Sequence, residues 1–309
     1  MDMTKRLLAV GFIITATRLF AQLPVDGVHY AAGQNGLGAG IPESTGFYAR
    51  DDNWIFTGSQ NHPFNFHTFV YMQAPQLMWL SQGTILGAHY GADVMIPLVY
   101  KEENNNNFVN VGLPPRIEVR SFTYQRGGLG DIKIEPLLLV WQWDQLDLMA
   151  GGAVWVPSGY YNSQSPVNLG NNSWSPMVTL DAAWHPDEAK TWTISVANHF
   201  EYNFQDPSPF YLPLATYTLE AAVGKTIFDH VDAGVAGYYQ QQINQQIGST
   251  PFLNQPIYNN DSSVAGAGPE ISYRIPDWDL AISVNYDHEF EAHDRPRGNV
   301  VDLTVTKRF

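Results

Sequence analysis

Histidine is the side chain in this sequence with the widest range of chemistry, and there are nine histidines. No HExxH motif occurs, and no two histidines lie two apart on a predicted strand with a carboxylate between them, so their spacing does not favour a metal site. Ser195 and His199 share one face of a predicted strand and are the only local pair that resembles a hydrolase site. Four residues of strand span roughly 13 Å, which is too far for proton transfer. The sequence therefore predicts no metal, no cofactor and no enzymatic activity.

A second set of ionisable residues recurs at alternate positions of predicted strands, so its members would point into one shared interior. Two interpretations are open for this mostly acidic set. It would either form an ion-paired network that fills a narrow barrel, or line a water-filled path that favours cations. The predicted lumen-lining residues are His89, Asp93, Asp131, Lys133, Glu135, Asp181, His199, Glu201, Glu220, Glu270, Arg274, Asp287 and Glu289.

The elements that would position these residues are amphipathic strands. In residues 277–291, Ile282, Val284 and Tyr286 alternate with polar residues that include Asn285 and Asp287. Residues 299–309 alternate in the same way and end on Phe309. A period of two places the two faces of a strand in different surroundings. Charged residues make up only 15% of the chain, and cysteine is absent. The pattern favours hydrocarbon around the apolar face, and the alternative is a soluble, secreted β-sandwich.

Twelve such strands are predicted, near residues 46–58, 66–80, 84–100, 128–143, 145–158, 173–186, 190–205, 210–227, 230–246, 262–275, 277–291 and 299–309. Tight connections, such as 81–83 and 186–189, alternate with mostly long ones, such as 101–127, 159–172 and 247–261. Short turns at one end and long loops at the other are typical of outer-membrane barrels. We therefore predict an all-β fold: a transmembrane antiparallel β-barrel of about 12 strands, with short periplasmic turns and longer extracellular loops.

The predicted organisation has three parts. Residues 1–21 have the basic start and apolar stretch of a secretory signal peptide. Residues 22–45 are rich in glycine and lack any strand or helix period, so they are either a disordered leader or a plug in the periplasmic mouth. Residues 46–309 would form the barrel. The formal net charge of −14 argues against nucleic acid as a partner.

Several short motifs occur in an order that is similar to a known family. They include residues 128–132 with Pro136, residues 155–161, residues 168–174, and His29-Tyr30 with Gly33 near the start. Over about residues 28–309 the chain resembles the outer-membrane transporter family named for the meta-pathway of phenol degradation. The resemblance implies a barrel in the bacterial outer membrane that passes hydrophobic or aromatic compounds. The strand ending on Phe309 resembles the closing strand of such barrels, which implies contact with the barrel-assembly machinery.

We therefore expect a channel in the outer-membrane lipid for passive uptake of small hydrophobic or aromatic molecules. Residues 22–45 would control passage. The alternatives are a general, weakly cation-selective porin and a closed structural or adhesive barrel. Neither the cargo nor the oligomeric state follows from the sequence. Aromatic residues of the predicted loops would capture the cargo: Phe108, Tyr160, Tyr161, Phe210 and Tyr211.

Overall fold

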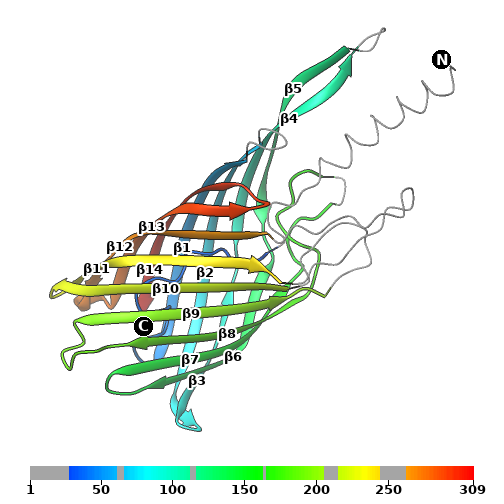
Figure 1. The fold of residues 1–309 in the computed structure, drawn as a ribbon. Helices are drawn as coiled ribbons and strands as arrows, with labels where there is room; N and C mark the ends of the chain where they lie inside the picture. The colour runs from blue at the N-terminus through cyan, green and yellow to red at the C-terminus, as the bar shows by residue number, and fades with distance from the viewer. Residues whose placement is uncertain (1–27, 61–65, 112–115, 163–164, 205–214, 244–261) are drawn as a thin grey trace.

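The wall of this protein is one antiparallel sheet that closes on itself, because β1 pairs with β14 on one side and with β2 on the other (Figure 1). The computed structural model describes residues 28–60, 66–111, 116–162, 165–204, 215–243 and 262–309. Its strands are β1 (Gly46–Gln60), β2 (Phe66–Ile85), β3 (Ala88–Met95), β4 (Leu98–Val111), β5 (Arg116–Leu129), β6 (Ile132–Gln142), β7 (Leu146–Val156), β8 (Ser175–Trp184), β9 (Trp192–Tyr202), β10 (Ala215–Phe228), β11 (Val231–Gln242), β12 (Ser263–Ile275), β13 (Leu280–His293) and β14 (Arg297–Arg308).

The fourteen strands form a barrel of twelve, because β3 and β4 together act as one interrupted strand, and so do β5 and β6. This confirms the predicted fold. The first interruption holds Pro97, and the second holds Gly130, whose N–H donates to the Pro97 carbonyl at 2.8 Å. A Cβ at Gly130 would lie 3.3 Å from Pro97 Cγ, so glycine allows the two bends to pack together. Beyond the bends, β4 and β5 continue as a two-stranded ribbon that projects past the barrel (Figure 1).

Two sequence predictions about the connections were wrong. Residues 101–127 were expected to be a loop, but most of them belong to the β4–β5 ribbon. The tight turn expected at residues 81–83 lies at Leu86 and Gly87, because β2 continues to Ile85. Both turn residues have positive φ (53° and 80°), as a two-residue type I′ hairpin requires.

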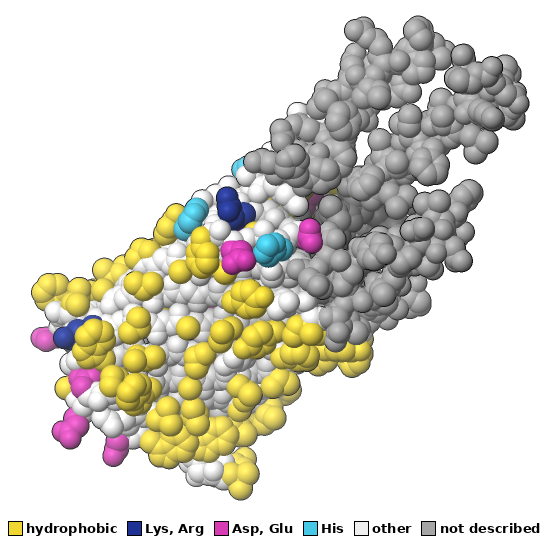
Figure 2. Space-filling model, in the orientation of Figure 1, with side chains coloured by type: hydrophobic (Ala, Val, Ile, Leu, Met, Phe, Trp, Pro, Cys, Tyr) yellow, Lys and Arg dark blue, Asp and Glu magenta, His cyan; other side chains and the backbone are white. Residues whose placement is uncertain are grey.

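The two faces of the wall meet different surroundings. Along β8, Val178 and Leu180 are exposed on the outside, whereas Thr179 and Asp181 between them are buried. On the side of the barrel shown in Figure 2, hydrophobic side chains spread over the outer face and charged ones gather toward the ends. This is the arrangement that a hydrocarbon belt imposes on a barrel. Within the described part of the chain, the one helix is the 3-10 turn η1 (Pro276–Trp278), and no helix could cross a membrane.

Candidate functional site

The segment that precedes β1, residues 28–45, lies among the inward side chains of the barrel, and we call it the N-terminal segment. Its backbone N–H groups donate to carboxylates of β9, β10 and β12. Its carbonyls accept hydrogen bonds from side chains of β1, β11 and β13. Because an irregular segment has no ladder of its own, these bonds satisfy backbone groups that would otherwise be buried without partners.

Glu220 on β10 is the wall carboxylate with the most hydrogen bonds to the N-terminal segment. It is 1% exposed and accepts from the Tyr30 hydroxyl at 3.0 Å, from Gly33 N at 2.5 Å and from Asn35 N at 2.9 Å. Gly33 has φ +88°, a conformation that favours glycine, and this turn aims two N–H groups at one carboxylate. Because three donors of the segment converge on this one carboxyl group, Glu220 is a principal anchor of the segment.

A second anchor is Glu270 on β12, which accepts from Leu37 N at 2.8 Å. The preceding residue, Gly36, packs so closely that a Cβ there would overlap the Glu270 carboxylate. The Gly36 carbonyl accepts from the Ser195 hydroxyl at 3.0 Å. A side chain at residue 36 would therefore have to displace the Glu270 carboxyl group, which accepts from Leu37 N.

His29 ties the start of the described segment to two carboxylates. Its Nδ1 lies 2.6 Å from Glu201 Oε1, its Nε2 lies 2.9 Å from Asp131 Oδ2, and its ring stacks on Trp155. Burial disfavours the charged imidazolium, but Glu201 and Asp131 outweigh this effect and raise the pKa of His29 to about 9. At neutral pH the ring is therefore charged and donates from both nitrogens.

Asp131, between β5 and β6, also holds the connection from β7 to β8. We call residues 157–174 the outer loop. Asp131 Oδ1 accepts from Gly159 N at 2.8 Å, and Oδ2 accepts from Asn171 N at 2.7 Å as well as from His29. One buried carboxylate thus joins the wall, the outer loop and the N-terminal segment.

A cavity of about 150 Å³, which we call the outer cavity, lies between the N-terminal segment and the end of the barrel with the long connections. In outer-membrane barrels the long loops are extracellular. The volume of the outer cavity is comparable to cavities that hold a single benzene ring. Residues 28–32 form one side of it. Its aromatic and apolar lining includes Trp54, Phe56, Val70, Met72, Trp155, Leu169 and Tyr238.

The periplasmic side of the segment is strongly polar. A cavity of about 60 Å³, the inner cavity, is lined by residues that include Arg50, Asp52, Asp93, Lys133 and Glu135. Lys133 Nζ lies 3.2 Å from Asp93 and 3.0 Å from Glu135, and Arg50 lies 2.8 Å from Asp52. Buried charges are stabilised by pairing, and Lys133 and Arg50 each meet carboxylates in the lining of this cavity.

Eleven of the thirteen predicted lumen-lining residues are buried: Asp93, Asp131, Lys133, Glu135, Asp181, His199, Glu201, Glu220, Glu270, Asp287 and Glu289. The other two lie toward the periplasmic end. His89 contacts the Ser81 carbonyl, and the half-exposed Arg274 contacts Glu43 and Asp232. Ser195 and His199 each contact the N-terminal segment, at Gly36 and Tyr30 respectively. Among the described residues, no group of three ligating side chains could hold a metal ion.

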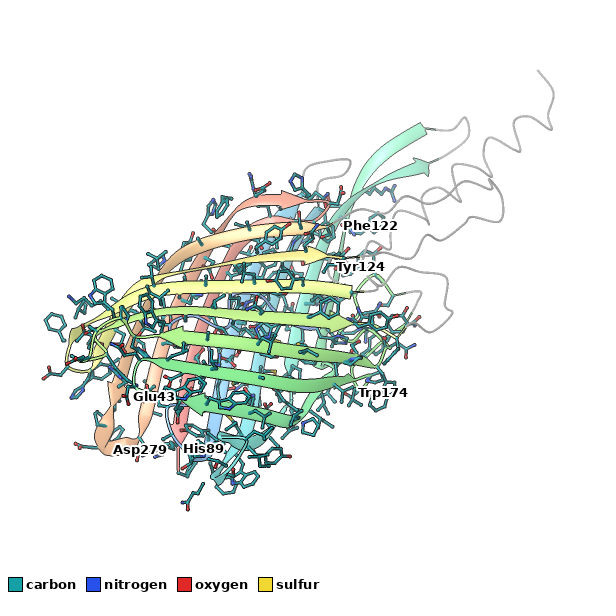
Figure 3. The ribbon with its side chains drawn as sticks, turned by 60° about the horizontal axis from the view of Figure 1, so that its bottom comes forward. Glu43, His89, Phe122, Tyr124, Trp174 and Asp279 are labelled. Carbon is teal, nitrogen blue, oxygen red and sulfur yellow. The ribbon has the colours of Figure 1, made fainter. Side chains whose placement is uncertain are left out.

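The predicted capture residues are only partly described. Tyr160 lies under the Arg126 guanidinium, 3.7 Å from ring centroid to Cζ, and Tyr161 is half-buried. Phe210, Tyr211 and the side chain of Phe108 lie outside the described part. Two aromatic residues that were not predicted, Phe122 and Tyr124 on β5, stack with centroids 6.5 Å apart. Figure 3 places them with Trp174 at the end opposite Glu43, His89 and Asp279.

Sequence reasoning missed several residues that line the outer cavity. His29 and Tyr30 were noted only as part of a family motif, and Trp54, Phe56 and Trp155 were not assigned to a site. The alternation of β1 and β7 could have placed the last three inside, because Asp52 and Ala153 share their faces. The residues around His29 do not alternate as in a strand, so its position inside the barrel could not be predicted in this way.

Comparison with known proteins supports the architecture. An outer membrane channel from Pseudomonas putida F1 has a similar fold, with a TM-score of 0.66 and 11% identity over 91% of this chain and 100% of that chain. A FadL homologue from Pseudomonas aeruginosa matches with a TM-score of 0.42 and 11% identity, over 85% of this chain and 89% of that chain. Among curated protein sequences, none matches this chain.

The match to a family model is more specific than the fold. It covers residues 51–304, from the middle of β1 to the middle of β14, and so spans most of the barrel wall. This match confirms the resemblance seen in the sequence motifs. The chain therefore belongs to the family described as "Putative MetA-pathway of phenol degradation".

Proposed function

We propose that this protein is a passive outer-membrane channel for small hydrophobic or aromatic compounds. The observation that carries the proposal is the outer cavity, which has the size of one aromatic ring and is lined by Trp54, Phe56, Trp155 and Tyr238. Apolar pockets with a few polar groups at their edge are the usual form of small-molecule sites. Such a pocket would remove an apolar compound from the polar outer leaflet and deliver it into the barrel.

The N-terminal segment acts as a plug in this proposal. It separates the outer cavity from the inner cavity, because Tyr30 lines both. Passage to the periplasm therefore requires the segment to move. The ion pairs of Lys133 with Asp93 and Glu135 lie beyond the segment. An apolar molecule would not bind stably to them, so cargo that passes the displaced segment would continue to the periplasm.

Cargo would reach the outer cavity past aromatic side chains at the extracellular end. Phe122 and Tyr124 stack on one face of β5, and Arg126 follows on the same face, above Tyr160. Aromatic faces bind apolar rings with little loss of conformational entropy. Of the predicted capture residues, we propose this role for Tyr160, whose ring lies under Arg126.

Filling the outer cavity is expected to block uptake. Val70→Trp adds an indole to a space of about 150 Å³, so a ring can no longer enter. We expect the initial rate of uptake of radiolabelled toluene by whole cells, whose intact outer leaflet is polar, to fall about tenfold or more.

The matched control is Val223→Trp, because Val223 is 43% exposed on the outer face of β10 and can accept the same bulk. Uptake should remain close to that of the unmodified protein. Equal uptake by the Val70→Trp and Val223→Trp proteins, at equal amounts in the membrane, would show that cargo does not use the outer cavity.

A further inference from the structure

Asp131 is buried at 3% exposure at a point where three separate parts of the chain meet. It occupies the bend between β5 and β6. Its carboxylate accepts hydrogen bonds from His29 Nε2 and from the backbone N–H groups of Gly159 and Asn171. The side-chain amide of Asn171 also lies 3.5 Å from His29 Nδ1. The N-terminal segment and the outer loop therefore touch each other at this carboxylate.

The outer loop is packed against Asp131 without spare room. A Cβ at Gly159 would lie 2.8 Å from the Gly130 carbonyl carbon and 3.0 Å from Asp131 Oδ1. A Cβ at Gly170 would lie 2.5 Å from the same oxygen. Because both glycines rest directly against the bend, a small displacement of the loop lengthens its bonds to Asp131.

The charge of His29 makes the two attachments interdependent. A buried carboxylate is costly unless a cation or several donors compensate it, and His29 is a cation in direct contact with Asp131. When the N-terminal segment leaves, water reaches Asp131 and competes with Gly159 and Asn171 for its oxygens. A hydrogen bond in contact with water contributes less than a buried one, so the outer loop is held more weakly.

We propose that Asp131 couples the N-terminal segment to the outer loop, so that displacement of either one loosens the other. This inference rests on the proposed plug function and adds its regulation. Linkage requires the coupling to be reciprocal. Leu169 and Asn171 of the outer loop line the outer cavity, so in this proposal the loop moves when cargo enters. Cargo arrival at the extracellular side thereby weakens the attachment of the plug.

The test uses two buried positions as probes in the full chain, which has no cysteine of its own. Ala32→Cys reports on the N-terminal segment and Val167→Cys on the outer loop, since these residues are 7% and 2% exposed. Gly36→Val displaces the segment at Glu270, and Gly159→Ala displaces the loop at Asp131. Labelling by a water-soluble maleimide is timed for each pair of probe and perturbation.

Coupling predicts that each perturbation raises the labelling rate at both probes, by about fivefold or more. With Asp131→Asn, whose neutral amide no longer pairs with charged His29, Gly36→Val should expose the segment probe alone. Val223→Ala on the outer face should change neither rate. The proposal is overturned if each perturbation exposes only the probe in its own part.

Toluene uptake by the Val70→Trp protein separates this inference from the proposed function. One outcome is that Val70→Trp blocks toluene uptake while each perturbation leaves the probe in the other part unlabelled. In that case the proposed channel stands and the coupling is wrong. If both probes respond but Val70→Trp leaves uptake unchanged, the coupling stands and the cargo path through the outer cavity is wrong.

Discussion

Replacing Glu220 by alanine is expected to open the barrel to ions. The substitution removes the acceptor of three hydrogen bonds from Tyr30, Gly33 and Asn35 and leaves two backbone N–H groups of the N-terminal segment without that partner. A buried donor that is left unsatisfied costs about 1–3 kcal/mol, so with two such N–H groups we expect a loss of about 3–4 kcal/mol of docking free energy. The population with an undocked segment should rise about 10²- to 10³-fold, and single-channel recording in planar bilayers measures this as open time.

Two other carboxylates serve as controls for Glu220→Ala. Glu270→Ala removes one segment bond, that of Leu37 N, and should open the barrel less often. Glu103→Gln alters a buried glutamate that pairs with Lys101, and should leave the open time unchanged. A Glu220→Ala protein that conducts no more than the unmodified one would show that the segment does not occlude the lumen.

Raising the pH is expected to release the N-terminal segment through His29. The docked pKa of about 9 lies above the ordinary value of 6.5, because Glu201 and Asp131 face the ring, and this outweighs its burial. The stabilisation is therefore complete below about pH 6.5 and is lost as the pH rises through about 9. A shift of this size corresponds to about 3 kcal/mol. Conductance should increase between pH 7 and pH 10.

The matched variant for this pH prediction is His29→Gln. Glutamine keeps a hydrogen-bond donor near Asp131 but cannot carry the charge. We expect this variant to be open more often at pH 7 and to lack the rise at high pH. The same rise in the His29→Gln protein would assign the pH dependence to a different group.

The wall of the barrel was predictable because hydrocarbon imposes a pattern on it. Apolar side chains must alternate with inward ones wherever a strand crosses the membrane, so Asp287 and Glu289 could be placed inside from the sequence alone. The β4–β5 ribbon escaped prediction for the same reason. It projects past the barrel, and the run Asn104–Asn107 has no apolar face to mark it as a strand.

The contacts between the N-terminal segment and the barrel wall were not predictable from local sequence. Residues 28–45 have no period, and they bind through backbone groups, which every residue type carries. Their partners, such as Glu220 and Asn285, are 187 and 252 residues away from Gly33. Strand alternation could show that these partners point inward, but only the structure shows that Gly33 meets them.

These separations also determine the order in which the protein assembles. The N-terminal segment is made before the strands, yet its bonds to strands β9 to β13 join residues that are 159 to 252 positions apart. The β1–β14 pairing that closes the sheet is similarly remote. Contacts of such high contact order form late, because the entropy of a very long loop is lost before they contribute. Docking of the segment and closure of the sheet are therefore both expected late in folding.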